Sequence, residues 1–290
     1  MKNLKIRIGT RKSKLAVAQT KMAADKIHSA YPEVETEIVY ISTKGDAVLD
    51  KPIADIGGRG VFVSEIEQAL SDNTIDIAVH SAKDLPIELA DGLEISAVLE
   101  RGNYRDVLAV RKGTVIGKAD SCKIGTGSIR RRVNFKNLYP NAEFADIRGN
   151  VDTRLKKLQN GEYDGIILAA AGLERLGLTD DESFDFKPFD YTEFLPAPCQ
   201  GIIAIESRKN DFTKEIMENI RDKNTFYSFE TERLIAKKLN ADCGMPLGAY
   251  SFVKDRRITV ALSTDGITRV EKTADFKNRL TLAKELILCL

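Results

Sequence analysis

A short apolar run that ends in polar residues stands at Ile75-Asp76-Ile77-Ala78-Val79-His80-Ser81-Ala82-Lys83-Asp84. Its first five residues are typical of a buried β-strand, and the polar residues after them could begin a helical turn. The same alternation of short apolar runs with amphipathic segments recurs along most of the 290 residues. This rhythm is typical of units in which a strand is followed by a helix, so the sequence predicts an α/β fold with mostly parallel strands.

The expected elements follow from the period of the apolar residues. Strands are expected at residues 6–8, 34–41, 75–79, 93–99, 107–110, 123–125, 143–147, 163–169 and 201–206, and helices from residue 13 and over 61–70, 128–138, 151–159, 171–176 and 222–239. The charged stretch 100–106 breaks the rhythm and is interpreted as a crossing between domains. The strand at 201–206 could return to either domain, and the remainder of the chain has the pattern of a small third unit.

The composition excludes some classes of protein. Lys and Arg number 44 and Asp and Glu 43, so the formal net charge is +1. This balance argues against a protein that coats nucleic acid, which needs a large uncompensated positive field. The N-terminus is charged and lacks a signal-like apolar core, and the apolar stretch around 166–171 is too short to span a bilayer. We therefore expect a cytoplasmic protein without membrane contact.

The histidines and cysteines limit the kinds of site that the chain can form. The two histidines, His28 and His80, are far apart, and the four cysteines form no CxxC pair, so the sequence predicts neither a metal site nor a disulfide framework. His80 ends an apolar strand and is expected in the core. Cys243 stands in a turn after a basic helix, where both an ordinary cysteine and an accessible thiolate fit.

Cations and helix-capping residues stand together where four predicted strands end. The four junctions are Gly9-Thr10-Arg11-Lys12-Ser13, Val79-His80-Ser81-Ala82-Lys83-Asp84, residues 125–132 and residues 146–154. One such junction is ordinarily a helix cap beside a surface cation. Four together indicate one cleft, because ligands of open parallel sheets bind beyond the carboxyl ends of the strands.

The ligand indicated by these junctions is a small polyanion held between two α/β domains. Arginine suits carboxylates and phosphates alike, so both remain open, with carboxylates favoured. No P-loop or complete dinucleotide fingerprint is present, and the glycine-rich residues 57–60 are interpreted as a loop over the cleft. Asp84 could cap its junction and pair with Lys83, or could offset positive charge that develops on a substrate.

These residues identify a resemblance to a known family. The chain resembles the porphobilinogen deaminase (hydroxymethylbilane synthase) family from residue 6 to about residue 250. The matching stretches are Thr10-Arg11-Lys12-Ser13 with Gln19, residues 57–62, residues 76–86, Gly125-Thr126-Gly127-Ser128-Ile129-Arg130-Arg131, residues 148–154, residues 168–173, Gln200-Gly201 and the turn around Cys243. Several stretches are long and stand in the order of the family, so the match is specific.

The resemblance implies three domains. The first comprises residues 1–99 with about 199–218, the second residues 100–198, and the third residues 219–290. The first two would resemble type II periplasmic binding proteins, and the third would be a small α+β domain that carries the cofactor. Neither the sequence nor the resemblance demands an oligomer, so a monomer is expected.

The resemblance also implies a reaction and a cofactor. The enzyme would be a transferase that condenses four porphobilinogen molecules into the linear tetrapyrrole hydroxymethylbilane with release of ammonia, in tetrapyrrole (haem) biosynthesis. A dipyrromethane cofactor would be tied through a thioether to Cys243. Asp84 would contact pyrrole N–H groups and stabilise the cationic azafulvene. Lys83, Asp84, Thr126, Ser128, Arg130 and Arg131 would hold the cofactor, and Arg11, Ser13, Gln19, Phe62, Arg148, Arg154, Gln200 and Gly201 would bind substrate or lie near the growing chain.

Four positions depart from the family pattern. Cys199 and Asp242 stand where glycine is usual, Asp55 where a basic residue is often found, and Lys14 where proline is common. A carboxylate next to Cys243 would raise the pKa of its thiol. None of the four belongs to the Arg and Asp set.

Two other classes of function remain alternatives. A two-domain cleft also suits a non-catalytic binding protein for small anionic solutes, but such proteins are generally exported and this chain shows no signal. Nucleic-acid binding through Arg130-Arg131-Arg132 is disfavoured by the balanced charge and by the absence of Trp.

Overall fold

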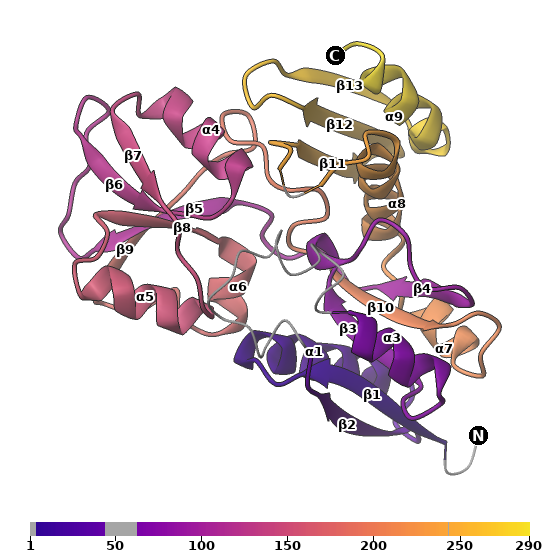
Figure 1. The fold of residues 1–290 in the computed structure, drawn as a ribbon. Helices are drawn as coiled ribbons and strands as arrows, with labels where there is room; N and C mark the ends of the chain where they lie inside the picture. Colours follow the sequence, from indigo (N-terminus) through magenta and orange to yellow (C-terminus); the bar gives the residue numbers. More distant parts are fainter. Residues whose placement is uncertain (1–3, 44–62, 243) are drawn as a thin grey trace. The chain divides into compact units, whose positions relative to one another are not determined.

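The computed structural model describes residues 4–43, 63–242 and 244–290 of the chain (Figure 1). Internal contacts divide the chain into two compact units. The first unit is Met1–Arg101 with Ile202–Phe229, and the second is Gly102–Gly201 with Glu230–Leu290. The division into three domains that the sequence suggested stays a prediction.

The first unit is built on a five-stranded sheet with the order β2-β1-β3-β10-β4. Its strands are β1 (Lys5–Arg11), β2 (Glu35–Ile41), β3 (Ile77–Ser81), β4 (Leu93–Val98) and β10 (Ile203–Arg208). β1 is parallel to β2 and β3, whereas β10 is antiparallel to both of its neighbours. One strand therefore runs against the other four, and the strand predicted near residues 201–206 lies in the sheet of this unit.

Helices cover both faces of this sheet. On one face, α1 (Lys14–Ala30) and α7 (Lys214–Ile220) bury Ile27 and Met217 against Ile6 and Ile8 of β1. On the other face, Ile66 and Leu70 of α3 (Ser64–Ser71) pack with the residues around β3. Alternate residues of a strand point to opposite faces, so a strand with apolar side chains on both faces fits between two helical layers.

The second unit contains a sheet of the same plan, with the order β7-β6-β8-β5-β9. Its strands are β5 (Asp106–Arg111), β6 (Cys122–Gly125), β7 (Ala142–Ala145), β8 (Gly165–Ala169) and β9 (Phe184–Pro188). β5 is antiparallel to β8 and β9, whereas β6 is parallel to β7 and β8. α4 (Ile129–Leu138) covers one face through Phe135, and α5 (Val151–Gln159) and α6 (Ala170–Arg175) cover the other.

A three-stranded antiparallel sheet completes the second unit. It contains β11 (Gly248–Lys254), β12 (Arg257–Ser263) and β13 (Val270–Asp275). η4 (Phe276–Asn278) leads into α9 (Arg279–Ile287), and α8 (Lys223–Lys238) precedes the sheet in the chain. Leu282 and Leu286 of α9 and Ile235 of α8 share one apolar cluster with Val260 of β12.

The α/β class predicted from the sequence is confirmed, and two elements were missed. β9 lies at the edge of its sheet and pairs only with β5, and its aromatic and charged residues alternate over only four positions, 184–187. α7 is only seven residues long, and it is stabilised by burying Ile216, Met217 and Ile220 against the first sheet. In both elements tertiary contacts supply what the local pattern lacks.

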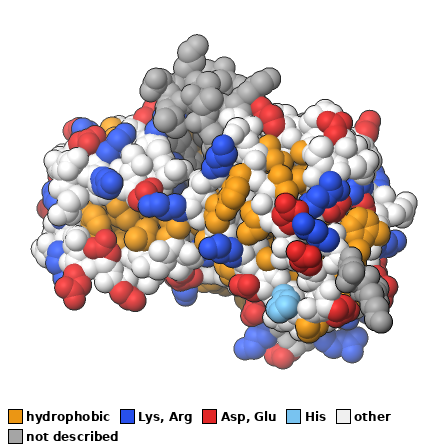
Figure 2. All heavy atoms as spheres, turned by 90° about the horizontal axis from the view of Figure 1, so that it is seen from below, with side chains coloured by type: hydrophobic (Ala, Val, Ile, Leu, Met, Phe, Trp, Pro, Cys, Tyr) orange, Lys and Arg blue, Asp and Glu red, His pale blue; other side chains and the backbone are white. Residues whose placement is uncertain are grey.

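The described surface has a mixed charge. On the face shown in Figure 2, Lys and Arg side chains are interspersed with Asp and Glu side chains. The interspersion agrees with the near-neutral composition. Within residues 4–43, 63–242 and 244–290, no helix is both long enough and apolar enough to cross a bilayer.

Candidate active site

The first junction follows β1. Arg11 is the last residue of the strand and is half-buried, and Ser13 caps α1, because its Oγ accepts the backbone N–H of Ala16 at 3.3 Å. A serine in this position satisfies one of the backbone donors that a helix leaves unpaired at its start. Both residues therefore lie where the sequence predicted, between a strand end and a helix N-terminus.

The second junction is the turn η3 (Ala82–Asp84), which follows β3. The backbone N–H of Ala82 donates to the carbonyl of Ile202 at 3.0 Å, which ties the turn to the start of β10. Lys83 is half-buried and Asp84 is exposed. The Asp84 carboxylate is thus accessible to a ligand on a turn whose backbone is fixed.

Gln19 connects the first two junctions. This side chain is only 2% exposed, and its Nε2 donates to Ser81 Oγ at 2.8 Å while the Ser81 hydroxyl lies 3.1 Å from Gln19 Oε1. The buried amide of α1 thereby holds the end of β3. The predicted role of Gln19 in substrate binding stays a prediction.

His80 lies in the core, as the sequence predicted, but it has a charged partner. His80 and Glu206 are 7% and 0% exposed, and Nε2 lies 3.0 Å from Glu206 Oε2. The other carboxylate oxygen of Glu206, Oε1, is buried without a hydrogen-bond partner among the described residues. One member of this buried ionisable pair, His80, therefore lies four positions before Asp84 in the chain.

The third junction leads from β6 into α4. Ser128 caps the helix, and its Oγ accepts the backbone N–H of Arg131 at 3.4 Å. Thr126, which is 1% exposed, accepts the backbone N–H of Ser128 on its Oγ1 at 3.2 Å. Both hydroxyls that the resemblance assigns to cofactor binding thus order the start of α4.

Arg130 and Arg131 converge on one carboxylate. Asp106, the first residue of β5, is fully buried, and its Oδ2 accepts Nη1 of Arg130 at 2.7 Å while its Oδ1 accepts Nε of Arg131 at 2.8 Å. The same guanidinium groups donate to the carbonyls of Leu195 at 2.6 Å and Ile167 at 2.9 Å. Burial lowers the pKa of Arg130, and the charge of Asp106 opposes this effect.

The neighbouring arginines contact different groups. Arg132 donates to the carbonyl of Thr126 at 3.1 Å and pairs with Asp146 at 2.6 Å, where the carboxylate is largely exposed. At the fourth junction, Arg148 is half-buried, and Arg154 in α5 donates from Nε to the carbonyl of Gly149 at 2.8 Å. The fourth junction therefore presents two half-buried guanidinium groups next to the N-terminus of α5.

The turn at residues 199–201 has an unusual backbone. Cys199 and Gly201 have positive φ of 63° and 86°. Gln200 is fully buried and donates from Nε2 to the carbonyl of Tyr104 at 2.8 Å. Arg175 donates to the carbonyl of Gly201 at 2.5 Å, and burial lowers the pKa of Arg175 to about 10.

Two predicted site residues, Phe62 and Cys243, lie outside the described residues, as do Asp55 and the loop at 57–60. Asp242, one of the departures from the family pattern, is described. Its Oδ1 accepts the backbone N–H groups of Gly244 at 2.8 Å and Met245 at 3.0 Å. This carboxylate therefore holds the backbone of Gly244 and Met245, the two residues that follow Cys243 in the sequence.

Comparison with known proteins decides the family. A family model described as "Porphobilinogen deaminase, dipyromethane cofactor binding domain" matches residues 6–216. This chain belongs to the porphobilinogen deaminase family.

Relatives cover nearly the whole chain. Porphobilinogen deaminase of Acetivibrio thermocellus is 43% identical over 277 residues, which cover 94% of this chain and 93% of the relative. A probable porphobilinogen deaminase of Picrophilus torridus is 45% identical over 246 residues, which cover 85% of each chain. Among solved structures, the periplasmic aliphatic sulphonate binding protein of Escherichia coli is 12% identical, covers 81% of this chain and 70% of its own, and has a TM-score of 0.43.

Sequence reasoning missed three buried carboxylates of this porphobilinogen deaminase family member. They are Asp106, Glu206 and Glu232, and all three are fully buried. Glu232 accepts the backbone N–H groups of Cys199 at 2.6 Å and Ser251 at 2.7 Å. A buried carboxylate is costly without partners, so an acidic residue at an apolar strand or helix position could have signalled such a contact.

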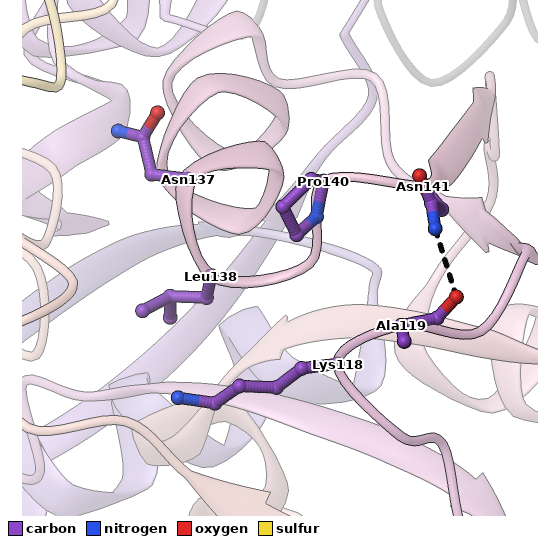
Figure 3. Close-up of a pocket in the computed structure, with 6 residues that line it drawn as sticks. All are labelled: Lys118, Ala119, Asn137, Leu138, Pro140 and Asn141. Atoms are coloured by element: carbon purple, nitrogen blue, oxygen red, sulfur yellow. Dashed lines mark hydrogen bonds between the residues drawn. The ribbon is translucent and has the colours of Figure 1, made fainter.

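The hollow drawn in Figure 3 lies elsewhere on the second unit. It has a volume of about 470 Å³ and is lined by Lys118, Ala119, Asn137, Leu138, Pro140 and Asn141. Asn141 donates from Nδ2 to the carbonyl of Ala119 at 2.8 Å (Figure 3). The hollow adjoins the C-terminal end of α4, whereas the residues that match the family motifs stand at the N-terminal end of that helix.

Proposed function

We propose that this protein condenses four molecules of porphobilinogen head to tail into hydroxymethylbilane and releases one ammonia molecule at each step. The observation that carries the proposal is the match of residues 6–216 to the cofactor-binding domain of the porphobilinogen deaminase family. The junctions support the proposal chemically, because porphobilinogen carries acetate and propionate groups and Arg side chains bind carboxylates through paired donors.

The residues at the start of α4 fit a dipyrromethane cofactor. Arg130 and Arg131 carry two positive charges and share one negative charge, that of Asp106. Acceptors among the described residues contact only Nη1 of Arg130, so its Nε and Nη2 groups are donors for a ligand carboxylate. The N-terminus of α4 adds backbone N–H groups and a favourable dipole. Thr126, Ser128, Arg130 and Arg131 would hold cofactor carboxylates, and we assign Lys83 and Asp84 to the same ligand.

Cys243 is proposed as the covalent attachment point through a thioether. When bound, the cofactor supplies the pyrrole carbon to which the first substrate is joined. Asp242 accepts the backbone N–H groups of Gly244 and Met245, which follow this position in the chain. We further propose that residues 219–290 form the domain that carries the cofactor.

The incoming substrate is assigned to the remaining cations and polar groups. Arg11, Arg148 and Arg154 would neutralise its carboxylates, with Ser13, Gln19, Phe62, Gln200 and Gly201 around them. Gln19 and Gln200 are buried and contact Ser81 and Tyr104, so they would act by ordering the backbone beside the substrate. Holding the substrate by several carboxylates fixes its reacting carbon, and such orientation lowers the barrier of a condensation.

Asp84 is proposed as the catalytic carboxylate. It is exposed on the turn η3, where the backbone is tied to β10. An ionised carboxylate can accept the pyrrole N–H and can offset the positive charge that develops on the substrate as ammonia leaves. The adjacent Lys83 places a positive charge next to Asp84 in the chain.

The proposal is tested by the stoichiometry of the reaction. The purified protein is incubated with porphobilinogen, and released ammonia and linear tetrapyrrole are measured in the same sample. We expect four ammonia molecules for each tetrapyrrole. Binding of porphobilinogen without release of ammonia would favour the alternative of a non-catalytic binding protein.

We also propose that the protein acts as a cytoplasmic monomer without nucleic acid or membrane. A single monomeric species in light scattering is the expected result for its oligomeric state.

A further inference from the structure

The buried carboxylate of Asp106 lies between the two guanidinium groups assigned to the cofactor. Asp106 is 0% exposed, and Arg130 and Arg131 are 5% and 8% exposed. Each carboxylate oxygen accepts from a different arginine, Oδ2 from Arg130 and Oδ1 from Arg131. A planar guanidinium group that donates to a fixed acceptor loses most of its rotational freedom.

The backbone fixes this carboxylate from two sides. Asp106 pairs with Ala169 of β8, and its carbonyl accepts the backbone N–H of Phe189 at 2.9 Å. The carboxylate therefore projects from the first residue of a strand that is paired on both sides, rather than from a loop. Carbonyl groups of Leu195 and Ile167 accept from the same two arginines, so each guanidinium group is held at two points.

The charges of the cluster do not cancel. The two guanidinium groups and the carboxylate of these described residues sum to a charge of +1, and all three side chains are almost closed to water. An unbalanced buried charge is costly, and an additional carboxylate would remove the imbalance. Burial lowers the pKa of Arg130, and the charge of Asp106 opposes this effect.

We propose that Asp106 is a positioning residue, which fixes the Arg130 and Arg131 guanidinium groups and reduces their joint charge to the single positive charge that one carboxylate of the cofactor balances. This inference rests on the proposed function, because it takes the ligand of the two arginines to be the cofactor. Asp106 itself touches neither cofactor nor substrate. It acts through the arginines, as an outer contact orients the groups that bind a ligand.

Asp106→Asn tests the inference, and Asp146→Asn is its matched control. The asparagine keeps the shape of the side chain but offers only one acceptor oxygen and no charge. Asp146 pairs with the neighbouring Arg132, and its carboxylate is 73% exposed. We expect Asp106→Asn to lower kcat roughly ten- to hundred-fold, the loss typical of a charge-assisted hydrogen bond. KM for porphobilinogen should stay unchanged, because other arginines are assigned to the substrate, and Asp146→Asn should retain the wild-type kcat.

A double-mutant cycle separates positioning from a merely structural role. Because Asp106 acts through Arg131 as well as Arg130, Asp106→Asn should lower kcat by a smaller factor in the Arg131→Gln background than in the wild type. Multiplying losses in the double variant would overturn the inference. A kcat of Asp106→Asn equal to that of Asp146→Asn would overturn it too. If Asp106→Asn does not fold, Asp106→Glu is measured, which keeps the charge but displaces the carboxylate, and a wild-type kcat in that variant would overturn the inference.

The wild-type protein distinguishes this inference from the proposed function. Absence of ammonia release by the wild-type protein would contradict the proposed function whatever the Asp106 variants do. Wild-type turnover combined with an undiminished Asp106→Asn would leave the proposed function intact and would refute the positioning role alone.

Discussion

His80 and Glu206 form a buried pair between adjacent antiparallel strands, with 3.0 Å between Nε2 and Oε2. His80 belongs to β3, which ends at Ser81, directly before the turn that presents Asp84. Glu206 is fully buried, and its Oε1 has no hydrogen-bond partner among the described residues. A polar side-chain contact with β10 thus helps to fix the strand that carries the candidate catalytic turn.

Glu206→Ala should lower the free energy of unfolding by about 2 kcal/mol or more, because His80 would remain buried without its partner. Glu206→Gln should lose less, since its side-chain amide can still bond to the imidazole. Glu218→Ala is the control, because Glu218 is exposed on α7, and its change should stay within about 0.5 kcal/mol. Urea denaturation measures all three, and equal stability of Glu206→Ala and Glu218→Ala would contradict the importance of the pair.

Gly201→Ala should destabilise the fold more than Gly161→Ala, a substitution at a glycine of similar backbone conformation. A Cβ at Gly201, where φ is +86°, would lie 2.7 Å from the carbonyl oxygen of Gly102. At Gly161, where φ is +78°, no atom lies within 4 Å of such a Cβ. Gly161→Ala should therefore cost only the left-handed backbone, about 1 kcal/mol. Thermal unfolding should show a clearly larger loss for Gly201→Ala, and equal losses would show that the contact with Gly102 is unimportant.

Asp265 should make the stability of the hairpin between β12 and β13 depend on pH. Its carboxylate accepts the backbone N–H of Ile267 and groups of Thr268 and Ser263, which lower its pKa to about 2. A lowered pKa means that the charged form stabilises the fold. The contribution is therefore complete above the usual Asp pKa of about 4 and is lost as the pH falls toward about 2. Lowering the pH from about 5 to about 2, the limits of this transition, should reduce the denaturation midpoint more in the wild type than in Asp265→Asn. Parallel curves for the two proteins would contradict this assignment.

The sequence predicted much of the fold because local patterns determine it. Residues 151–159 were expected as a helix and α5 has these bounds, since its apolar residues Leu155 and Leu158 recur at helical spacing. β9 was missed because its alternating pattern is only four residues long, and its position depends on pairing with β5 at a sheet edge and on the packing of Phe184 in the core. Local period carries no information about such a pairing.

The candidate site was predictable only in part. The cations and capping residues were found from the strand–helix junctions, and Ser13 and Ser128 indeed cap α1 and α4. The family resemblance alone indicated Gln19, Phe62, Gln200 and Gly201. Asp106 was not found, because it stands 24 positions before Arg130 and only the folded sheet brings the two together. The sequence also gave no sign that Gln19 contacts Ser81, a contact between residues 62 positions apart.

Asp84→Asn should abolish most of the turnover without changing the fold. Asp84 is exposed, so its effect on the free energy of unfolding should stay within about 0.5 kcal/mol. Loss of the charge that offsets the developing cation should lower kcat by about 100-fold or more. Asp91→Asn, at another exposed position of the first unit, is the control and should keep its kcat. Substantial turnover by Asp84→Asn would refute the catalytic role of Asp84.

The central claim is that a cofactor made from the substrate is attached to Cys243 and supports the condensation. Its most direct test is the intact mass of the purified protein after incubation with porphobilinogen and removal of unbound pyrroles, alongside Cys243→Ala treated identically. We predict that the wild-type mass exceeds the sequence mass by at least two pyrrole units and that Cys243→Ala has the sequence mass alone. A wild-type protein with the bare sequence mass, or an equal pyrrole load on Cys243→Ala, would contradict the claim.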